Sequence, residues 1–285
     1  MSQSRILLTN DDGIDSPGVR ALAEALDDVG DVLVVAPATE QSAMGRSLSY
    51  GRTAASYTEQ SDLRYVEDAD GYSYEIAADE GRIGYALSGS PCDCVIAGLN
   101  AFGSPPDVVV SGCNDGPNLG ASVLSRSGTV SAAMEAAYSG VPAVAVSTDS
   151  DGSDYRSAAR FTARFVERLH ENGAGRAAYF NLNVPAGDGS WSNATRTRPC
   201  PLYRMDAERS GGRVRVTNPM LKTDSGVIER TPGDTDRAAF VRRRETSVSP
   251  LALPGTPVDV GWVTEDISAP PTEGRVESKP ATQPD

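Results

Sequence analysis

The chain has 285 residues, 39% of them hydrophobic, and a formal net charge of −13 from 39 acidic and 26 basic residues. This acidity argues against binding to a nucleic-acid polymer, whose phosphates require clustered positive charge. No apolar run approaches the roughly 18 residues of a membrane span, and the N-terminus shows no secretory leader. We therefore expect a cytoplasmic protein that binds no membrane. Its two lysines, Lys222 and Lys279, among so many acids also indicate adaptation to concentrated salt.

Neither the four cysteines nor the single histidine forms a catalytic or zinc-binding pattern. Cys92 and Cys94 are one residue apart, whereas zinc ligands are usually separated by roughly two to four residues. His170 lies near the end of a helical pattern, where a cationic or polar side chain is favourable. We expect reduced, packed cysteines and a structural His170, which leaves acid–base chemistry to carboxylates or metal-bound water.

Strands and helices alternate through the first two-thirds of the chain, which predicts a Rossmann-like, three-layer α/β core with a mostly parallel sheet. Ser16 and Ser127 are suited to cap two of the helices. The expected strands are 5–8, 31–36, 107–112, 141–147 and 178–185, and the expected helices are 17–26, 91–99, 127–139 and 155–171.

The regular alternation ends near Pro185. We expect residues 1–190 to form the catalytic core, with a hairpin excursion at about 48–83 where short alternating segments are separated by turn residues. Residues 191–265 then form a smaller β-rich lobe or arm. Residues 266–285 are acidic and proline-rich without apolar periodicity, which predicts a disordered tail.

The most informative segment is Asn10-Asp11-Asp12-Gly13, at the carboxyl end of the first strand. Two adjacent carboxylates are costly to desolvate there unless a positive charge lies between them. Ligands of open α/β sheets also collect at this edge, so the position suits a cation site. The alternative interpretation is an Asp-rich turn.

Two more loops follow the strands 31–36 and 107–112, and a parallel sheet brings all three loops to one edge. Together they offer four oxygen donors: Asp11, Asp12, Ser42 and Asn114. Such oxygens suit hard cations such as Mg²⁺ or Mn²⁺. Asn114 alone could equally shape a turn.

Ser127-Gly128-Thr129 begins a predicted helix. Free backbone N–H groups and the helix dipole attract anions, and the two hydroxyls add hydrogen-bond donors. A plain serine N-cap is the alternative. Beside a metal pocket, the segment indicates a phosphate site.

Seven groups of residues, in chain order, carry a resemblance to a known family. They are Leu8-Thr9-Asn10-Asp11-Asp12-Gly13; Ala36-Pro37 with Gln41-Ser42-Ala43; Gly89-Ser90-Pro91 with Asp93-Cys94-Val95; Val110-Ser111-Gly112 with Asn114, Gly116, Asn118 and Gly120; Ser127-Gly128-Thr129-Val130; Asn181-Leu182-Asn183-Val184-Pro185; and Ser247-Val248-Ser249-Pro250-Leu251. In these groups, over nearly the whole chain to about residue 265, the sequence resembles the SurE (survival protein E) nucleotidases.

The resemblance implies a Rossmann-like, metal-dependent phosphomonoesterase that hydrolyses nucleoside 5′- and 3′-monophosphates. It also implies a homodimer or homotetramer that associates through a C-terminal arm. One divalent ion per subunit, Mg²⁺ or Mn²⁺, would be present. The implied site residues are Asp11, Asp12, Ser42 and Asn114 for the metal, with Asp11, Asp12 and Asn114 also catalytic, and Asn10, Ser127, Gly128 and Thr129 for the substrate.

The chain departs from the family pattern in two loops. Gly45-Arg46 stands where members often have Gly-His. Arginine cannot shuttle a proton but can contact phosphate, so Arg46 joins the expected substrate-binding residues. Residues 121–126, ASVLSR, replace a stretch that usually carries an acidic pair and a tyrosine, and the loop is one residue longer here. These changes bear on rate and substrate preference.

The expected mechanism is in-line attack by a metal-activated water, with the helix N-terminus and Arg46 stabilising the transition state. Attack by Asp11 or Asp12, which would form an aspartyl phosphate, is the other possibility. The alternative function is a nucleotide-binding or regulatory protein that has lost turnover. The altered loop 120–127 leaves room for that alternative.

Overall fold

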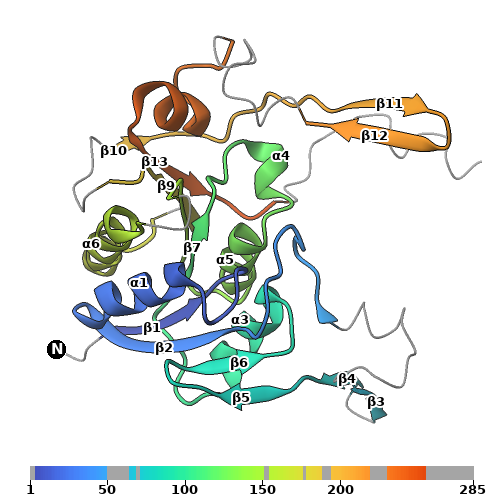
Figure 1. Ribbon diagram of the computed structural model, residues 1–285. Helices are drawn as coiled ribbons and strands as arrows, with labels where there is room; N and C mark the ends of the chain where they lie inside the picture. Colours follow the sequence, from blue (N-terminus) through green and yellow to red (C-terminus); the bar gives the residue numbers. More distant parts are fainter. Residues whose placement is uncertain are drawn as a thin grey trace, which may run out of the picture. The chain divides into compact units, whose positions relative to one another are not determined.

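The computed structural model describes residues 4–49, 64–68, 71–150, 154–175, 178–187, 194–218 and 230–254. A large sheet dominates this part of the chain (Figure 1). Its strands are β1 (Ser4–Thr9), β2 (Gly30–Pro37), β5 (Ala78–Glu80), β6 (Tyr85–Leu87), β7 (Val108–Asp115), β8 (Ala143–Thr148), β9 (Tyr179–Val184), β10 (Ala194–Arg196) and β13 (Thr246–Leu251). They lie in the order β10-β13-β9-β8-β7-β1-β2-β6-β5, and those from β9 to β6 run parallel.

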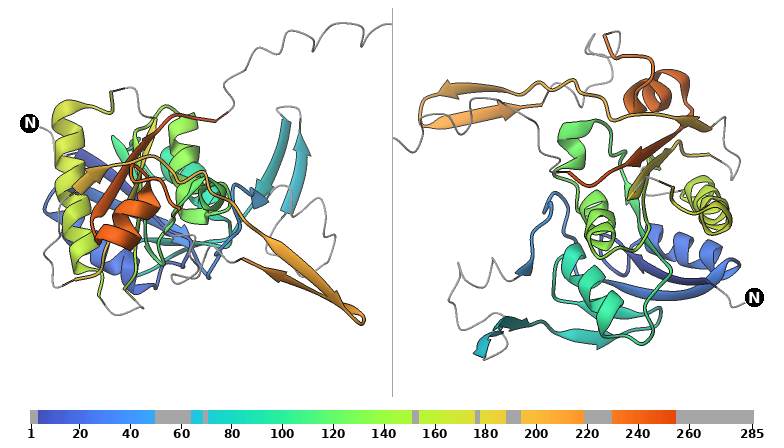
Figure 2. Two further views of the ribbon diagram at one scale, coloured as in Figure 1. Left: turned by 90° about the horizontal axis from the view of Figure 1, so that it is seen from above. Right: turned by 180° about the vertical axis from the view of Figure 1, so that it is seen from behind.

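Helices cover both faces of this sheet. α1 (Pro17–Asp27) and α6 (Arg156–Asn172) pack on one face, while α3 (Pro91–Asn100) and α5 (Gly128–Tyr138) pack on the other (Figures 1 and 2). Side chains alternate along β1, so that Ile6 and Leu8 join the first hydrophobic cluster and Leu7 joins the second. The predicted three-layer α/β fold is confirmed.

The helix starts follow from their capping residues. The Ser16 hydroxyl accepts a hydrogen bond from the Val19 N–H, and Pro17 occupies the first helical position, where its missing N–H costs nothing. Ser127 caps α5 in the same way, through the Val130 N–H at 3.2 Å. No helix in the described ranges is long and apolar enough to cross a membrane.

The region after residue 190 divides between two sheets. β10 and β13 extend the main sheet, and Met1–Leu253 form one compact unit, so the sheet continues across the expected boundary at residue 190. β11 (Asp206–Ser210) and β12 (Arg213–Thr217) form a separate antiparallel hairpin (Figure 2). Its role as an oligomerisation arm stays a prediction, and the tail expected at 266–285 lies outside the described residues.

One antiparallel pair lies within the range 48–83 of the expected hairpin excursion: β3 (Arg64–Asp68) pairs with β4 (Gly71–Glu75). β5, also in this range, pairs with β6, which lies just beyond it. Two short helical elements have no counterpart in the sequence prediction: α4 (Ala121–Leu124) and the π-helical turn η2 (Ala238–Arg242).

Close contact between α1 and β7 requires a glycine at position 18. A Cβ there would lie 2.1 Å from the carbonyl oxygen of Cys113, so Gly18→Ala must displace the helix or the strand. We expect a loss of about 1–3 kcal/mol in the free energy of unfolding, because the clash outweighs the better helix propensity of alanine, about 1 kcal/mol. Urea unfolding measures this loss. The control is Gly212→Ala, whose Cβ would meet no atom within 4 Å; equal losses in both variants would contradict the packing argument.

Candidate active site

Loops from three strands meet at the C-terminal edge of the parallel sheet. They form a cavity of about 250 Å³ whose lining includes Asp11 after β1, Ser42 after β2, Asn114 near the end of β7 and Ser127 before α5. The ends of neighbouring parallel strands share one edge, which explains how residues so distant in sequence become neighbours. The structure thus brings together three of the four expected metal ligands, while Asp12 lies beside this cavity and not in its lining.

Asp11 is the deepest acidic group of the site, with 3% of its surface exposed. Thr129, in the first turn of α5, donates its hydroxyl hydrogen to Asp11 Oδ1 at 2.6 Å. A Cβ on Gly128 would lie 2.7 Å from Asp11 Oδ2, so only glycine lets the helix approach the carboxylate this closely. Burial raises the pKa of Asp11, and hydrogen bonds from the hydroxyl and N–H of Thr129 oppose that rise.

Asp12 is less buried than Asp11, but its surroundings also disfavour the ionised form of its carboxyl group. Burial, followed by the negative charges of Asp11, Glu40 and Asp115, raises the pKa of Asp12 to about 7. A hydrogen bond from the backbone N–H of Asp115 opposes this rise. Repulsion among several carboxylates is relieved by a cation, so the electrostatics of this edge fit a metal site.

Asn114 owes its position to a bulge in β7. Ser111 lies opposite Ala145 of β8 and Asn114 lies opposite Ser147, so three steps along β7 match two along β8. Such bulges commonly re-aim side chains beside functional sites. The amide nitrogen of Asn114 donates to the carbonyl oxygen of Gly116, which leaves the amide oxygen as the group suited to a cation.

Ser42 is held at the cavity by its neighbours in the loop. The Gln41 N–H donates to the backbone oxygen of Asp11 at 2.6 Å, and the Gly45 N–H donates to the Arg126 oxygen at 3.1 Å. The Ser42 N–H donates to a carboxylate oxygen of Glu40 at 3.0 Å. The Ser42 hydroxyl therefore lies on a loop that is fixed to both β1 and the start of α5.

Asn10 is buried and shapes the loop after β1. Its amide nitrogen donates to the Gly13 oxygen and to the Ser16 hydroxyl, each at 2.9 Å. Its amide oxygen is buried without a hydrogen-bond partner among the described residues. The structure therefore gives Asn10 a role in loop geometry, and the cavity lining does not include it.

Three buried asparagines hold the loop after β7 against the neighbouring strands β8 and β9. The amide nitrogen of Asn118 donates to the Ser147 hydroxyl at 2.9 Å. The backbone oxygen of Asn118 accepts hydrogen bonds from the side chains of Asn181 and Asn183 on β9, at 2.9 and 3.2 Å. Asn118 also lines the cavity. The sequence indicated a site near Asn118 because this residue belongs to the Asn-rich motif at the end of β7. The motif did not predict the hydrogen bonds between Asn118 and β9.

Arg46 does not line the cavity, contrary to its expected place in the substrate-binding set. Its guanidinium forms an ion pair with Glu135 at 2.6 Å and lies 4.4 Å from the centre of the Tyr138 ring, and both partners belong to α5. Arg126 lines the cavity instead, next to Ser127. The sequence did not indicate that Arg126 lines the cavity, because it lies in the loop that departs from the family pattern.

The donor set of the cavity fits a hard cation. Its side-chain oxygens come from carboxylate, amide and hydroxyl groups, the ligands that Mg²⁺ and Mn²⁺ prefer. The described residues contain no cluster of three His, Cys, Asp or Glu side chains suited to a metal. All four cysteines are buried and unpaired, and burial raises the pKa of the Cys113 thiol beside the site. A thiolate site of the zinc type is therefore not formed by these residues.

The fold is a Rossmann-like α/β fold with a polar cavity at the C-terminal edge of its sheet, the edge where open α/β sheets bind their ligands. Residues 6–207 match the family model described as survival protein SurE. A "5′-nucleotidase SurE" of Haloarcula marismortui is 40% identical over 270 residues, 90% of this chain and 91% of the relative. A protein of the same description in Natronomonas pharaonis is 43% identical over 264 residues, covering 87% and 93%. The chain belongs to the SurE family.

Comparison with a solved structure supports the same family assignment. The crystal structure of the SurE protein from Aquifex aeolicus superimposes with a TM-score of 0.67 and 28% identity, covering 88% of this chain and 94% of that one. The two sequence relatives above are haloarchaeal, which accords with the acidic, lysine-poor composition of the chain.

The Thr129 hydroxyl provides a direct test of the buried carboxylate. Thr129→Val keeps the shape of the side chain but removes the hydrogen bond to Asp11. We expect a loss of about 1.5–3 kcal/mol in the free energy of unfolding at pH 8 with chelator, because the lost bond involves a charged group. Urea unfolding gives this value.

The matched control is Thr162→Val. Thr162 is also fully buried, but its hydroxyl donates to the Ala158 carbonyl oxygen within α6 and not to a carboxylate. That bond supplements the helical ladder, so its loss should cost less than about 1 kcal/mol. Equal costs for the two variants would show that Thr129 does not stabilise a charged Asp11.

Proposed function

We propose that this chain is a metal-dependent phosphatase that hydrolyses nucleoside monophosphates to nucleoside and phosphate. The observation that carries the proposal is the cavity in which oxygens of Asp11, Ser42 and Asn114 face the start of α5. A cation requires negatively charged oxygens and a phosphate requires a positive or hydrogen-bond-donating partner. This cavity offers acidic oxygens beside a helix N-terminus. The relatives named 5′-nucleotidase supply the substrate class.

The proposed metal is one divalent ion per subunit, Mg²⁺ or Mn²⁺, with Asp11, Asp12, Ser42 and Asn114 as its ligands. When bound, the ion supplies Lewis-acid stabilisation of a phosphoryl oxygen and a water molecule of lowered pKa. The protein holds these residues on three separate loops. The Gln41 N–H joins the loop after β2 to the Asp11 oxygen, and the Thr129 hydroxyl joins Asp11 to the start of α5. That arrangement supports positioning of the phosphate without movement of the sheet.

The proposed phosphate site lies at the start of α5, at Ser127, Gly128 and Thr129. Gly128 has no side chain to block an anion, and the helix dipole favours negative charge there. The Thr129 hydroxyl is bonded to Asp11, so we assign Thr129 to positioning that carboxylate. Arg126 takes over the role first expected of Arg46, because it is among the residues that line the cavity and it carries the positive charge that suits phosphate. Its guanidinium donates to the Ser122 oxygen and the Tyr203 hydroxyl, each at 3.3 Å.

Attack by water is favoured over attack by Asp11. Gly128 and Thr129 cover the Asp11 carboxylate, which is almost fully buried. A nucleophile needs an open approach to phosphorus along the line of the leaving oxygen. Asp11 therefore suits a role as ligand and anchor, and water is the proposed nucleophile.

The β11–β12 hairpin is the proposed surface for a homodimer or homotetramer. Val214 and Val216 lie on one face of β12 and are 63% and 65% exposed. Apolar side chains at such exposure are suited to contact with another subunit.

We also assign the chain to the cytoplasm, since its four cysteines are all unpaired.

Hydrolysis of AMP with Mn²⁺ tests the proposed function. We expect phosphate release by the wild type, its loss with chelator, and its recovery when Mn²⁺ is added back. Asp11→Asn should lower kcat/KM by more than about a hundredfold, because even outer partners of a bound metal contribute 10- to 100-fold. The control is Asp15→Asn, four residues further along, where the carboxylate is 89% exposed; its activity should stay within about twofold, as for most surface substitutions.

Two results would contradict the proposal. Phosphate release that persists in Asp11→Asn or in chelator would overturn the metal assignment. Binding of AMP by the wild type without any phosphate release would favour the rival, a nucleotide-binding protein without turnover.

A further inference from the structure

The loop that carries Ser42 has an unusual backbone conformation. We call residues 38–49, which follow β2, the Ser42 loop. Ala43, the residue after Ser42, has a φ of +60°, and Gly45 has a φ of +58°. The left-handed region suits glycine, but it is unfavourable for alanine because of its Cβ. Such a conformation persists only where the surroundings impose it. Contacts between this loop and the rest of the protein therefore decide where Ser42 lies.

Two of these contacts lie on either side of the left-handed residues. The Gln41 N–H donates to the backbone oxygen of Asp11, just after β1, at 2.6 Å. At the end of the loop, the Ser49 N–H donates to the buried carboxylate of Asp93 at 3.1 Å, and Asp93 belongs to α3. These contacts fix the loop to β1 on one side and to α3 on the other.

The Arg46 side chain fixes the part between them to α5. Its guanidinium forms an ion pair with Glu135 at 2.6 Å and lies 4.4 Å from the centre of the Tyr138 ring. These two partners are three residues apart on α5, so they lie on one face of the helix. The Glu135 side chain is only 15% exposed, and salt screens a partly buried ion pair less than a surface pair. The aromatic ring adds a cation–π attraction.

α5 is also the helix that begins at the proposed phosphate site. Arg46 therefore connects the loop of a proposed metal ligand, Ser42, to the helix that Ser127 caps. The Gly45 N–H, next to Arg46, adds a hydrogen bond to the Arg126 oxygen at 3.1 Å. Movement of the loop away from α5 would carry Ser42 with it, so the separation of the proposed cation and phosphate sites depends on these contacts.

We infer that Arg46 is a positioning residue for the metal site: its contacts with Glu135 and Tyr138 hold the Ser42 loop against α5 and so hold Ser42 at the cavity. This inference rests on the proposed function for the role of Ser42 as a ligand. It gives Arg46 a role that needs no contact with substrate. Histidine, which family members often have at this position, is shorter and mostly neutral at pH 7, so it does not offer the same pair of contacts.

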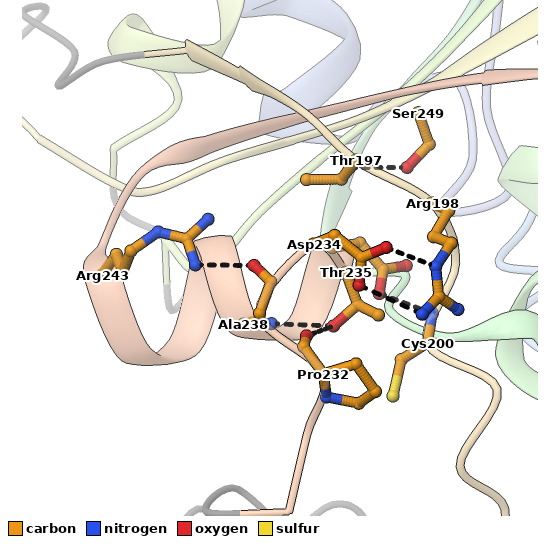
Figure 3. A network of polar contacts seen from close by, with 11 residues as sticks. Thr197, Arg198, Cys200, Pro232, Asp234, Thr235, Ala238, Arg243 and Ser249 are labelled. Carbon is orange, nitrogen blue, oxygen red and sulfur yellow. Dashed lines mark hydrogen bonds and ion pairs between the residues drawn. The ribbon is translucent and has the colours of Figure 1, made fainter.

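Hydrogen exchange in the metal-free protein tests the hold on the loop directly. In Arg46→Ala, the amides of residues 41–45 should exchange at least about tenfold faster than in the wild type, because the loop opens more often. Amides of β8 should exchange as in the wild type, which shows that the variant is folded. The matched control is Arg198→Ala. Arg198 forms an ion pair of similar length with Asp234, 2.7 Å, on a segment outside the Ser42 loop (Figure 3). Its loss should leave the exchange of residues 41–45 unchanged.

Binding of Mn²⁺ to the protein without substrate tests the consequence for the metal. Electron paramagnetic resonance measures the free Mn²⁺ and so gives its Kd. Arg46→Ala and Glu135→Gln should each raise this Kd about tenfold, because groups that orient a metal ligand contribute 10- to 100-fold to affinity. The double variant should show no more than the effect of one substitution, since both remove the same contact. Arg198→Ala should bind Mn²⁺ as the wild type does.

Unchanged exchange of residues 41–45 in Arg46→Ala would overturn the inference. Faster exchange with an unchanged Kd for Mn²⁺ would also overturn it, as would effects of the two substitutions that multiply in the double variant. A wild type that binds no Mn²⁺ would reject the proposed metal site. Faster exchange in Arg46→Ala would then still show that Arg46 holds the loop against α5, so the two claims fail separately.

Discussion

Burial of the Asp11 carboxylate at the end of β1 is the constraint on which the site depends. A carboxylate that is 3% exposed has lost most of its hydration, and burial raises its pKa. The start of α5 offsets this cost: Thr129 donates a hydrogen bond, and Gly128 leaves the carboxylate its space. The segment Ser127-Gly128-Thr129 therefore has two structural roles: it caps α5, and it shields the buried carboxylate of Asp11 from solvent. This packing is the basis of the proposed anion site beside the proposed cation site.

The loop from Gly116 to Ser127 connects the parts of the site. Asn118 fixes one side of it to β9, and Asp236 fixes Gly120 to the segment before η2. Val123 of this loop lines the cavity of the candidate active site. The sequence departs from the family pattern in this same loop. The loop contains none of the proposed metal ligands, so we expect changes in it to bear on substrate preference.

The sequence predicted the features that depend on local pattern and on parallel topology. Strand and helix positions, the Ser16 and Ser127 caps and the approach of Asp11 to Asn114 belong to this group. Features that depend on individual long-range contacts were not predictable. Arg46 forms an ion pair with Glu135, which is 89 residues away in the sequence. No local sequence pattern predicts that pairing. The addition of β13 to the main sheet likewise arises from packing between segments that are distant in sequence.

The central claim is that oxygens from three loops hold one divalent ion beside the start of α5. Anomalous diffraction from crystals soaked in Mn²⁺ tests this claim most directly, because it locates the ion without reference to activity. The account predicts one strong peak per subunit, in contact with oxygens of Asp11, Asp12, Ser42 and Asn114. A peak elsewhere in the subunit, or an empty cavity in crystals saturated with Mn²⁺, would contradict it.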